Sequence, residues 1–218
     1  MSIHRSSVTD HCSPIAVHQL GLVDYETMWK QMRTFTSSRT RESADEIWCA
    51  EHPPVYTLGI QTRPENLPSI RSAIPVVQSD RGGQITYHGP GQVVMYPLLD
   101  LRRHGLGVRA LVRKLEDAVI ALLADYGVEA HGNDKAPGVY VGNAKIGALG
   151  LRIRNGCSYH GLSLNVDMDL TPFAAIHPCG HPGLRVTQAR DCGIVDSPEF
   201  IANKLAASFA AQLRVDPS

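Results

Sequence analysis

A long amphipathic segment followed at once by three strand-like segments is the feature that most constrains the fold of this 218-residue chain. Between residues 108 and 126 the apolar side chains recur at helical spacing, and Gly127 supplies a stop signal. Strand-like runs follow at 138–141, 145–153 and 159–166, separated only by short turns. Strands joined by short turns pair antiparallel, whereas a doubly wound parallel sheet needs a crossover helix between strands. We therefore expect an α/β (α+β) fold, with a mixed, largely antiparallel sheet and helices packed on it.

Further helices and strands are predicted along the rest of the chain. One helix is predicted from Asp24 to about Ser38, and another from Ser197–Pro198 to about Leu213, with Ser197 as its cap. Short apolar runs bounded by Pro or Gly predict strands at 47–50, 55–58, 74–78 and 93–99.

The polar, aperiodic residues 1–14 predict a loose N-terminal arm, which is followed by a single domain over residues 15–218. The stretch 130–137 is an alternative domain boundary, but it is short enough for a surface loop within a single domain.

The charge balance and the cysteines exclude several broad classes of protein. Lys and Arg together number 21, and Asp and Glu together also number 21. No excess of positive charge therefore favours nucleic acid or an anionic membrane as a partner. Apolar runs such as 118–124 are too short to cross a bilayer, and the N-terminus lacks the apolar stretch of a signal peptide. The five cysteines form no C-x-x-C pair, which argues against a disulfide framework and against structural zinc. We expect a reduced, cytoplasmic protein without a metal or other cofactor.

The densest cluster of unusual residues is the segment 81–92, RGGQITYHGPGQ. Its four glycines allow the backbone to approach a ligand closely and to present N–H groups to it, while Arg81 and His88 add polar donors. The segment matches neither GxxxxGK[ST] nor GxGxxG, so the nucleotide-binding motifs do not apply. A hairpin with Gly and Pro turns accounts for the composition equally well.

A second candidate is Cys179, which stands in the segment 176–183, IHPCGHPG. A cysteine between Pro and Gly is expected in a constrained loop, where thiols are more often accessible, so Cys179 is a candidate nucleophile. A metal site is an alternative, because His177, Cys179 and His181 have the spacing of ligands on a strand, although the intervening prolines disfavour a strand there. An inert buried thiol is a further alternative.

The third candidate is Lys145, in the segment 143–150, NAKIGALG. A lysine among small and apolar residues can act as a base once it is desolvated, and as a cation it can stabilise a nearby thiolate. A lysine on an edge strand that faces solvent fits the segment as well. Spacing alone does not choose the partner of Cys179 among Lys145, His88, His160, His177 and His181, and His160 also fits a packed, hydrogen-bonded histidine.

Four segments together resemble the signature blocks of the bacterial octanoyltransferases, the lipoyl(octanoyl) transferases of the lipoate-protein ligase B type. They are RGGQITYHGPGQ (81–92), AKIGALG (144–150), HGLSLNV (160–166) and PCG (178–180). The likeness extends over roughly residues 15–215, and the first block with a downstream PCG is its most specific part. Looser forms of the Gly-rich block and of the following lysine occur in biotin and lipoate ligases. The resemblance therefore implies the biotin/lipoate protein ligase-like catalytic fold.

The resemblance also implies a function. Enzymes of this family move an octanoyl group from octanoyl-acyl carrier protein to a lysine of a lipoyl domain, in the first step of endogenous lipoate synthesis. The acceptors are the lipoyl domains of 2-oxoacid dehydrogenase complexes and the glycine cleavage H protein. By motif, Cys179 is the nucleophile that carries the acyl group and Lys145 is its activating partner, and no cofactor or metal is required. The implied acyl pocket consists of Arg81, Gly82, Gly83, Gln84, Ile85, Thr86, Tyr87, His88, Ala148, Leu149, Gly150, Gly161, Leu162 and Ser163.

Several alternatives stay open beside this resemblance. The family more often has Asn and an aromatic residue beside PCG, so no role is assigned to His177 and His181. The rival functions are an ATP-dependent lipoate or octanoate ligase, an amidotransferase that takes octanoate from another lipoylated protein, and a non-catalytic module that binds acyl carriers. A basic stretch is a candidate docking site for the acidic carrier, or else the solvated start of a helix; it consists of Arg102, Arg103, Arg109, Arg113 and Lys114.

Overall fold

The computed structural model describes residues 15–64, 67–68, 73–133, 136–176 and 183–214. Its largest element is an eight-stranded sheet in the order β1–β2–β6–β10–β9–β8–β7, with β11 attached to β9. Its strands are β1 (Ala16–Leu22), β2 (Glu46–Glu51), β6 (Gln92–Leu98), β7 (His131–Gly132), β8 (Gly138–Val141), β9 (Ala144–Arg154), β10 (Cys157–Asn165) and β11 (Arg185–Val186). β1 is parallel to β2 and β11 is parallel to β9, whereas the other neighbours are antiparallel. The predicted mixed, largely antiparallel sheet is confirmed.

A smaller sheet stands beside the large one and carries part of the Gly-rich segment. Its order is β4–β3–β5, with β3 parallel to β4 and antiparallel to β5. Its strands are β3 (Val55–Leu58), β4 (Val76–Gln78) and β5 (Thr86–His88). Tyr56 and Tyr87 of this sheet pack with Phe173 of the short 3₁₀ helix η2 (Thr171–Ala175) in a separate apolar cluster.

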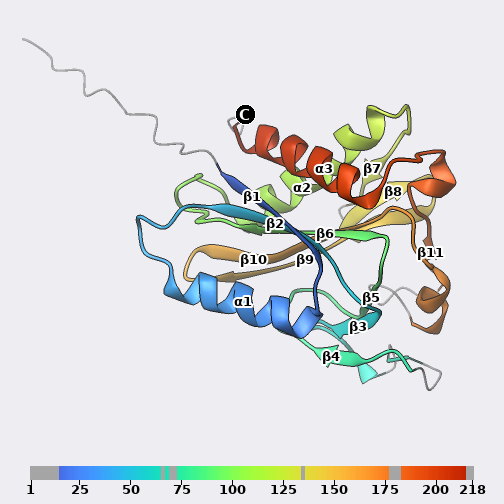
Figure 1. The fold of residues 1–218 in the computed structure, drawn as a ribbon, viewed down its shortest axis with the longest axis horizontal. Coiled ribbons are helices and arrows are strands. Elements are labelled where there is room, and N and C mark those ends of the chain that lie inside the picture. The colour runs from blue at the N-terminus through green and yellow to red at the C-terminus, as the bar shows by residue number, and fades with distance from the viewer. Residues whose placement is uncertain (1–14, 65–66, 69–72, 134–135, 177–182, 215–218) are drawn as a thin grey trace, which may run out of the picture.

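Among the described residues, three α-helices cover the two faces of the large sheet (Figure 1). The helix α1 (Tyr25–Ser38) lies on one face, and α2 (Val108–Ala124) and α3 (Pro198–Arg214) lie on the other. Alternation along β6 serves both layers: Val93 and Met95 join the core under α2 and α3, while Val94 and Tyr96 join the core under α1. β6 and β10 are buried along their whole length, since they are neighbours in the middle of the sheet.

The helix ends follow the signals in the sequence. Asp24 caps α1 by accepting a hydrogen bond from the Thr27 N–H at 2.8 Å, and Ser197 Oγ accepts one from the Phe200 N–H at 3.3 Å at the start of α3. After α2 the chain turns through Gly127 at φ +73°. The three predicted helices are therefore present, with ends within two residues of the prediction. Within the described ranges, no helix is long and apolar enough to cross a membrane.

The structure also has four strands that the sequence patterns do not predict, namely β1, β5, β7 and β11. All seven residues of the edge strand β1 are exposed, so β1 offers no apolar alternation to detect. β5 has three residues inside the Gly-rich segment, and β7 and β11 have two residues each. Strands this short are set by tertiary pairing, which local patterns do not contain.

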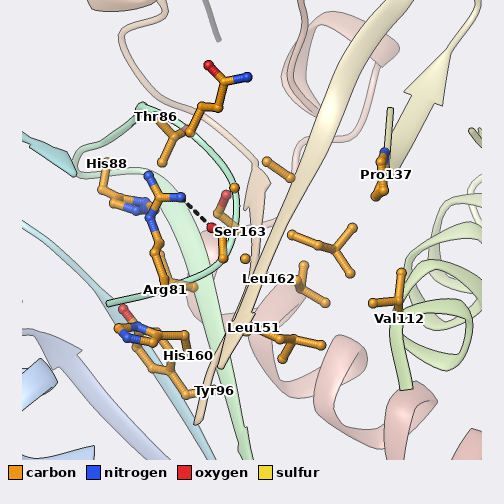
Figure 2. A pocket seen from close by; sticks show the side chains of 18 of the residues that line it. Arg81, Thr86, His88, Tyr96, Val112, Pro137, Leu151, His160, Leu162 and Ser163 are labelled. Carbon is orange, nitrogen blue, oxygen red and sulfur yellow. Dashed lines mark hydrogen bonds between the residues drawn. The ribbon is translucent and has the colours of Figure 1, made fainter. Parts of the chain in front are cut away.

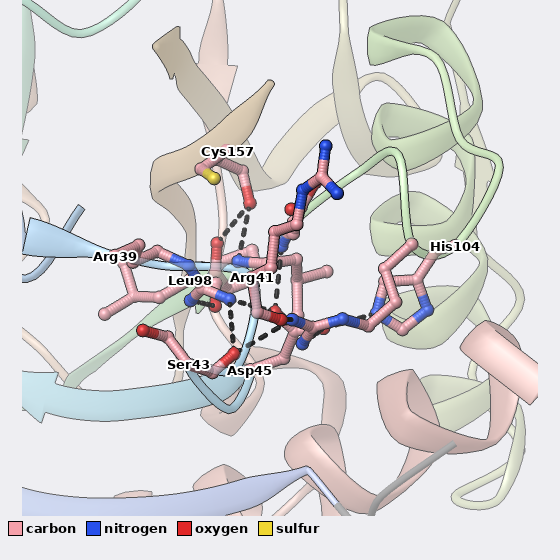
Figure 3. A network of polar contacts seen from close by, with 12 residues as sticks. Arg39, Arg41, Ser43, Asp45, Leu98, His104 and Cys157 are labelled. Atoms are coloured by element: carbon pink, nitrogen blue, oxygen red, sulfur yellow. Dashed lines mark hydrogen bonds and ion pairs between the residues drawn. The ribbon is translucent and has the colours of Figure 1, made fainter. Parts of the chain in front are cut away.

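A buried aspartate ties the end of α1 to the loop that leads into α2 (Figure 3). Asp45 accepts hydrogen bonds from His104 Nε2 at 2.8 Å, from the Asp100 N–H at 2.8 Å and from Arg39, and Arg103 lies 3.1 Å away. Burial raises the pKa of this carboxyl, but the hydrogen bonds from His104 and Asp100 and the arginine charges outweigh burial and lower it. The network fixes the loop before α2, and with it the point at which α2 begins.

Candidate active site

A cavity of about 430 Å³ lies between the Gly-rich segment, β9, β10 and the start of α2 (Figure 2). This volume is in the range of small-ligand sites in proteins. It is lined by Tyr25, Gln61, Arg81, Gly82, Gly83, Gln84, Ile85, Thr86, His88, Val94, Tyr96, Val108, Val112, Ala136, Pro137, Ala148, Leu149, Gly150, Leu151, His160, Gly161, Leu162 and Ser163.

One wall of the cavity is the loop around Arg81. The buried guanidinium donates from Nε to Thr57 Oγ1 at 3.0 Å, from Nη2 to Thr57 O at 2.6 Å and from Nη1 to Gly82 O at 2.9 Å. The loop lies directly on β9, where the Gly82 N–H donates to Leu151 O at 3.0 Å. A Cβ at Gly150 would come within 2.9 Å of Gly82 O, so a glycine there permits this close approach. Arg81 is therefore a rigid part of the wall.

Asp80 clamps the same loop to two other elements. Its carboxylate accepts hydrogen bonds from Trp29 Nε1 at 2.7 Å, Tyr159 Oη at 2.6 Å and His160 Nε2 at 2.9 Å. Burial raises the pKa of Asp80, but the hydrogen bonds from His160 and Tyr159 outweigh burial and lower it strongly. Burial lowers the pKa of His160, so this cavity-lining imidazole is neutral and donates to Asp80 from Nε2. The ionised Asp80 thus joins α1, β10 and the Arg81 loop.

The strand β5 turns alternate side chains toward the cavity. Thr86 and His88 line it, whereas Tyr87 faces away and packs against Tyr56 and Phe173, with ring centroids 5.6 and 5.5 Å apart. Burial lowers the pKa of His88 to about 3, so its imidazole is neutral at physiological pH. The motif resemblance implies that Tyr87 lines the pocket with its neighbours. Successive side chains of a strand point to opposite faces, however, so Tyr87 points away from the pocket.

The opposite wall of the cavity is apolar. Val108 and Val112 of α2, together with Leu149, Leu151 and Leu162 of β9 and β10, supply aliphatic side chains. In the close-up, Val112 lies across the cavity from the polar side that holds Arg81 (Figure 2). An alkyl chain fits such a wall, because it buries apolar surface against it.

Lys145 lies next to this cavity. Its side chain is 3% exposed, and Nζ donates to Pro137 O at 3.0 Å and stands 5.2 Å from the centre of the Tyr140 ring. Gly138, at φ +146°, leaves the room for this arrangement, because a Cβ there would come within 2.9 Å of Lys145 Nζ and 2.7 Å of Gly147 O.

A much smaller hollow beside Lys145 adjoins the main cavity. Thr86, Ala148 and Ser163 line both spaces, and Lys145 lines the smaller one. The side chains shared by the two spaces at this point are therefore small ones. Lys145 is not a solvent-facing residue of an edge strand, because β9 lies inside the sheet and the lysine is buried.

Cys179, His177 and His181 lie outside the described residues. The chain on either side of them is described. Ile176 is buried in the cluster around Tyr87, and β11 pairs Val186 with Lys145. Among the described residues, no three His, Cys, Asp or Glu side chains group as metal ligands.

The comparisons with known proteins decide the family. Residues 24–210 match the family described as the lipoyl protein ligase A/B catalytic domain. The chain belongs to this family.

Several known proteins resemble this chain in sequence or in structure. An octanoyltransferase of Nitrosomonas eutropha is 56% identical over 97% of this chain and 93% of its own length. An octanoyltransferase of Pseudomonas syringae pv. syringae is 60% identical over 91% and 89%. A lipoate-protein ligase A bound with ATP superposes with a TM-score of 0.73 at 17% identity, over 94% of this chain and 87% of that one. A biotin protein ligase from Aquifex aeolicus gives 0.60 at 13% identity, over 91% and 70%. These two likenesses show the fold.

The structure of this lipoyl protein ligase A/B domain brings the predicted pocket residues together with one exception. All of them line the cavity except Tyr87, and Lys145 adjoins it. The lining residues outside the predicted pocket are Tyr25, Gln61, Val94, Tyr96, Val108, Val112, Ala136, Pro137, Leu151 and His160. Val108 and Val112 belong to the apolar stripe of a predicted helix, and such a stripe does not distinguish a cavity wall from core.

Proposed function

We propose that this chain transfers an octanoyl group from a carrier-protein thioester to a lysine of a lipoyl domain, through a thioester on Cys179. The observation that carries the proposal is the buried Lys145 beside a cavity that residues of three motif segments, 81–92, 144–150 and 160–166, help to line. The relatives named octanoyltransferase, at 56–60% identity, support the choice of acyl group. At about 0.8 kcal/mol for each buried methylene, an eight-carbon chain gains roughly 5 kcal/mol against the apolar wall.

In the first half-reaction, the octanoyl group moves to the enzyme. Lys145 takes the proton of the Cys179 thiol, and the thiolate attacks the carbonyl carbon of the donor thioester. The new carbon–sulfur bond replaces the bond to the carrier sulfur, and the Lys145 ammonium protonates the departing carrier thiolate. The hydrogen bond to Pro137 O holds Lys145 Nζ in place for both proton transfers.

In the second half-reaction, the octanoyl group moves to the acceptor. The neutral amine of the acceptor lysine attacks the Cys179 thioester, and Cys179 departs as a thiolate. Lys145 takes the proton that the attacking amine releases, so the product is an amide and the enzyme regains a thiolate–ammonium pair. The donor thioester already carries an activated acyl group, so the balance requires no ATP.

The start of α2 is the part of the surface that we assign to the acidic carrier. Arg102 pairs with Asp100 at 3.0 Å and Arg103 pairs with Asp45 at 3.1 Å, so both hold the loop before α2. Arg109 is exposed in the first turn of α2, one residue after Val108 of the cavity wall. A positive charge at this position favours an acidic carrier that presents its acyl group to the cavity.

Mass spectrometry of the intact protein tests the proposal directly. Wild type, Cys179→Ser and Cys192→Ser are incubated with octanoyl-acyl carrier protein and then with a lipoyl domain. We expect one octanoyl adduct on wild type and on Cys192→Ser, lost on addition of the lipoyl domain, and none on Cys179→Ser. The partly exposed Cys192 provides a matched control for loss of a thiol.

Other outcomes identify the rival functions. An adduct on Cys179→Ser that maps to a residue other than position 179 would refute the covalent role of Cys179. Transfer of free octanoate only when ATP is added would identify a ligase. Stable carrier binding without adduct or transfer would identify a binding module.

A further inference from the structure

A continuous line of buried polar side chains runs from the Arg81 wall to the strand beside Lys145. Gln92 ends the Gly-rich segment and Asn165 ends β10, yet the proposed chemistry uses neither. Both are buried, at 1% and 5% exposure. A buried side-chain amide is stable only when its donors and acceptors are hydrogen-bonded. The hydrogen-bond partners of Gln92 and Asn165 therefore show which elements these side chains connect.

The line consists of five successive hydrogen bonds. In order, they join Arg81 Nε to Thr57 Oγ1 at 3.0 Å, Thr57 Oγ1 to His88 Nε2 at 3.4 Å, His88 Nδ1 to Gln92 Oε1 at 2.6 Å, Gln92 Nε2 to Asn165 Oδ1 at 2.8 Å, and Asn165 Nδ2 to Thr187 O at 2.9 Å.

The direction of each bond follows from the carbonyl at the far end. Thr187 O only accepts, so Asn165 must turn its NH₂ group toward it and its oxygen toward Gln92. Gln92 must then donate to Asn165, which agrees with its second bond, from Nε2 to Tyr87 O at 3.3 Å. Gln92 Oε1 therefore faces His88 as an acceptor, and His88 must carry its proton on Nδ1.

The same reasoning continues to the cavity wall. His88 is neutral, so its Nε2 has a lone pair and accepts from the Thr57 hydroxyl. The Thr57 oxygen in turn accepts from the Arg81 guanidinium. All five bonds thus run the same way, from a permanent positive charge toward a backbone carbonyl, and bonds aligned in this manner polarise and strengthen one another.

The far end of the line is fixed to the strand of Lys145. The Thr187 N–H donates to Lys145 O at 2.9 Å, and Val186 of β11 pairs with Lys145. The Ala189 N–H donates back to Asn165 O at 3.0 Å, so Asn165 holds this segment on both sides of Gln188. Asn165 also lines the small hollow beside Lys145.

We propose that Gln92 and Asn165 are positioning residues, which hold β11 against the strand of Lys145 and join both to the Arg81 wall. The kinetic part of this inference rests on the proposed function, because it assumes that Lys145 acts in acyl transfer. The structural part, the attachment of β11 through Asn165, stands without it.

The substitution Asn165→Asp tests the inference with almost no change in shape. An aspartate still accepts from Gln92 but has no N–H for Thr187 O, and its charge repels that carbonyl. We expect hydrogen exchange of the Thr187 amide to quicken about 10- to 100-fold, the range for loss of one buried hydrogen bond. In quenched single-turnover reactions, we expect acyl-thioester formation to slow by a similar factor while the KM for octanoyl-acyl carrier protein changes less than about twofold.

A second variant gives a readout that mere destabilisation does not produce. Gln92→Glu loses the donor to Asn165 and puts a carboxylate beside His88 Nδ1, which favours the imidazolium form. A protonated His88 no longer accepts from Thr57, so the line breaks there. We expect this variant to lose activity on acidification over a pH range in which wild type keeps it, and a pH profile parallel to that of wild type would contradict the inference.

The control is Asn203→Asp, the same change on the exposed face of α3, which should leave the Thr187 exchange rate and acylation unchanged. Wild-type Thr187 exchange in Asn165→Asp would overturn the inference. Should Asn165→Asp not fold, the smaller and uncharged Asn165→Ser decides by the same criterion. If wild type forms no acyl-thioester, the proposed function fails while the exchange measurement still decides whether Asn165 holds β11.

Discussion

Loss of the Asp80 carboxylate should destabilise the protein more than loss of any exposed aspartate. Asp80→Ala removes the acceptor of three hydrogen bonds, from Trp29, Tyr159 and His160. Two of the donors belong to residues that are almost fully buried, and each is left without this partner at a cost of about 1–3 kcal/mol. The Asp80 side chain is 31% exposed, so water replaces part of what is lost. We expect a decrease of about 2–4 kcal/mol in the free energy of unfolding at pH 7.

The pH dependence of this decrease has a definite sign. The pKa of Asp80 is lower in the folded protein than in the unfolded chain, where it is near 3.9. Its contribution is therefore complete above about pH 5 and is lost as the pH falls below the unfolded value toward the folded one. At pH 3 wild type should have lost about 1 kcal/mol of this contribution to its free energy of unfolding, whereas Asp80→Ala does not have the contribution at any pH. The difference between the two proteins should accordingly shrink on acidification.

Urea unfolding at pH 7 and at pH 3, followed by tryptophan fluorescence and by far-UV circular dichroism, measures both quantities. Asp117→Ala, an exposed aspartate on α2, should change stability by no more than about 0.5 kcal/mol. Asp80→Asn keeps an acceptor for His160 and should fall between wild type and Asp80→Ala. A decrease below about 1 kcal/mol in Asp80→Ala, or a difference that grows as the pH falls, would refute the assignment of Asp80 as an ionised clamp.

Three further predictions concern His88, Lys145 and the carrier. Between pH 6.5 and pH 5 the unfolded chain protonates His88 and the native protein does not, so stability in urea titrations should fall by about 2 kcal/mol; a flat profile would contradict its buried neutral state. Gly138→Ala should slow acylation at least about tenfold, because its Cβ would crowd Lys145 Nζ. The control Gly142→Ala also lies at positive φ, but its Cβ would meet nothing within 4 Å, so it should lower stability alone. Equal acylation rates in the two variants would exclude the crowding. Arg109→Glu should raise the KM for octanoyl-acyl carrier protein and flatten its salt dependence, and an unchanged KM would place carrier docking elsewhere.

The parts of the fold that the sequence predicts are those whose burial repeats along the chain. The stripe of α2 and the caps at Asp24 and Ser197 produce local signals, so these helices appear with nearly correct ends. β1 is different, because an exposed edge strand is specified by its partner β2 and not by its own pattern. The same is true of β11, whose two residues become a strand only through Ala144 and Lys145.

The sequence likewise predicts one part of the candidate site and not another. The Gly-rich segment is visible in the sequence because glycines and charged residues seldom gather in this way, and it does line the cavity. The pattern does not show which member faces away, and the strand geometry of β5 turns Tyr87 into the neighbouring apolar cluster. Tyr25, Val108 and Pro137 reach the cavity from elements far apart in the chain, so only the tertiary fold identifies them as its lining.

The residues of the motif segments therefore have two different roles, which the sequence alone does not distinguish. Some of their residues form the cavity surface, such as Gly82 and Ser163, while others fix the relative position of the walls, such as Gln92 and Asn165. The second group must satisfy every buried donor and acceptor, because an unpaired polar group in a buried network is costly. The Arg81 loop contacts β9 directly through Gly82 and Leu151, and the polar line is a second connection, which joins this loop to the segment beside Lys145. Under our proposal, acylation near Lys145 and acyl binding at the Arg81 wall depend on this polar line. A substitution in it should alter transfer without touching the acyl chain.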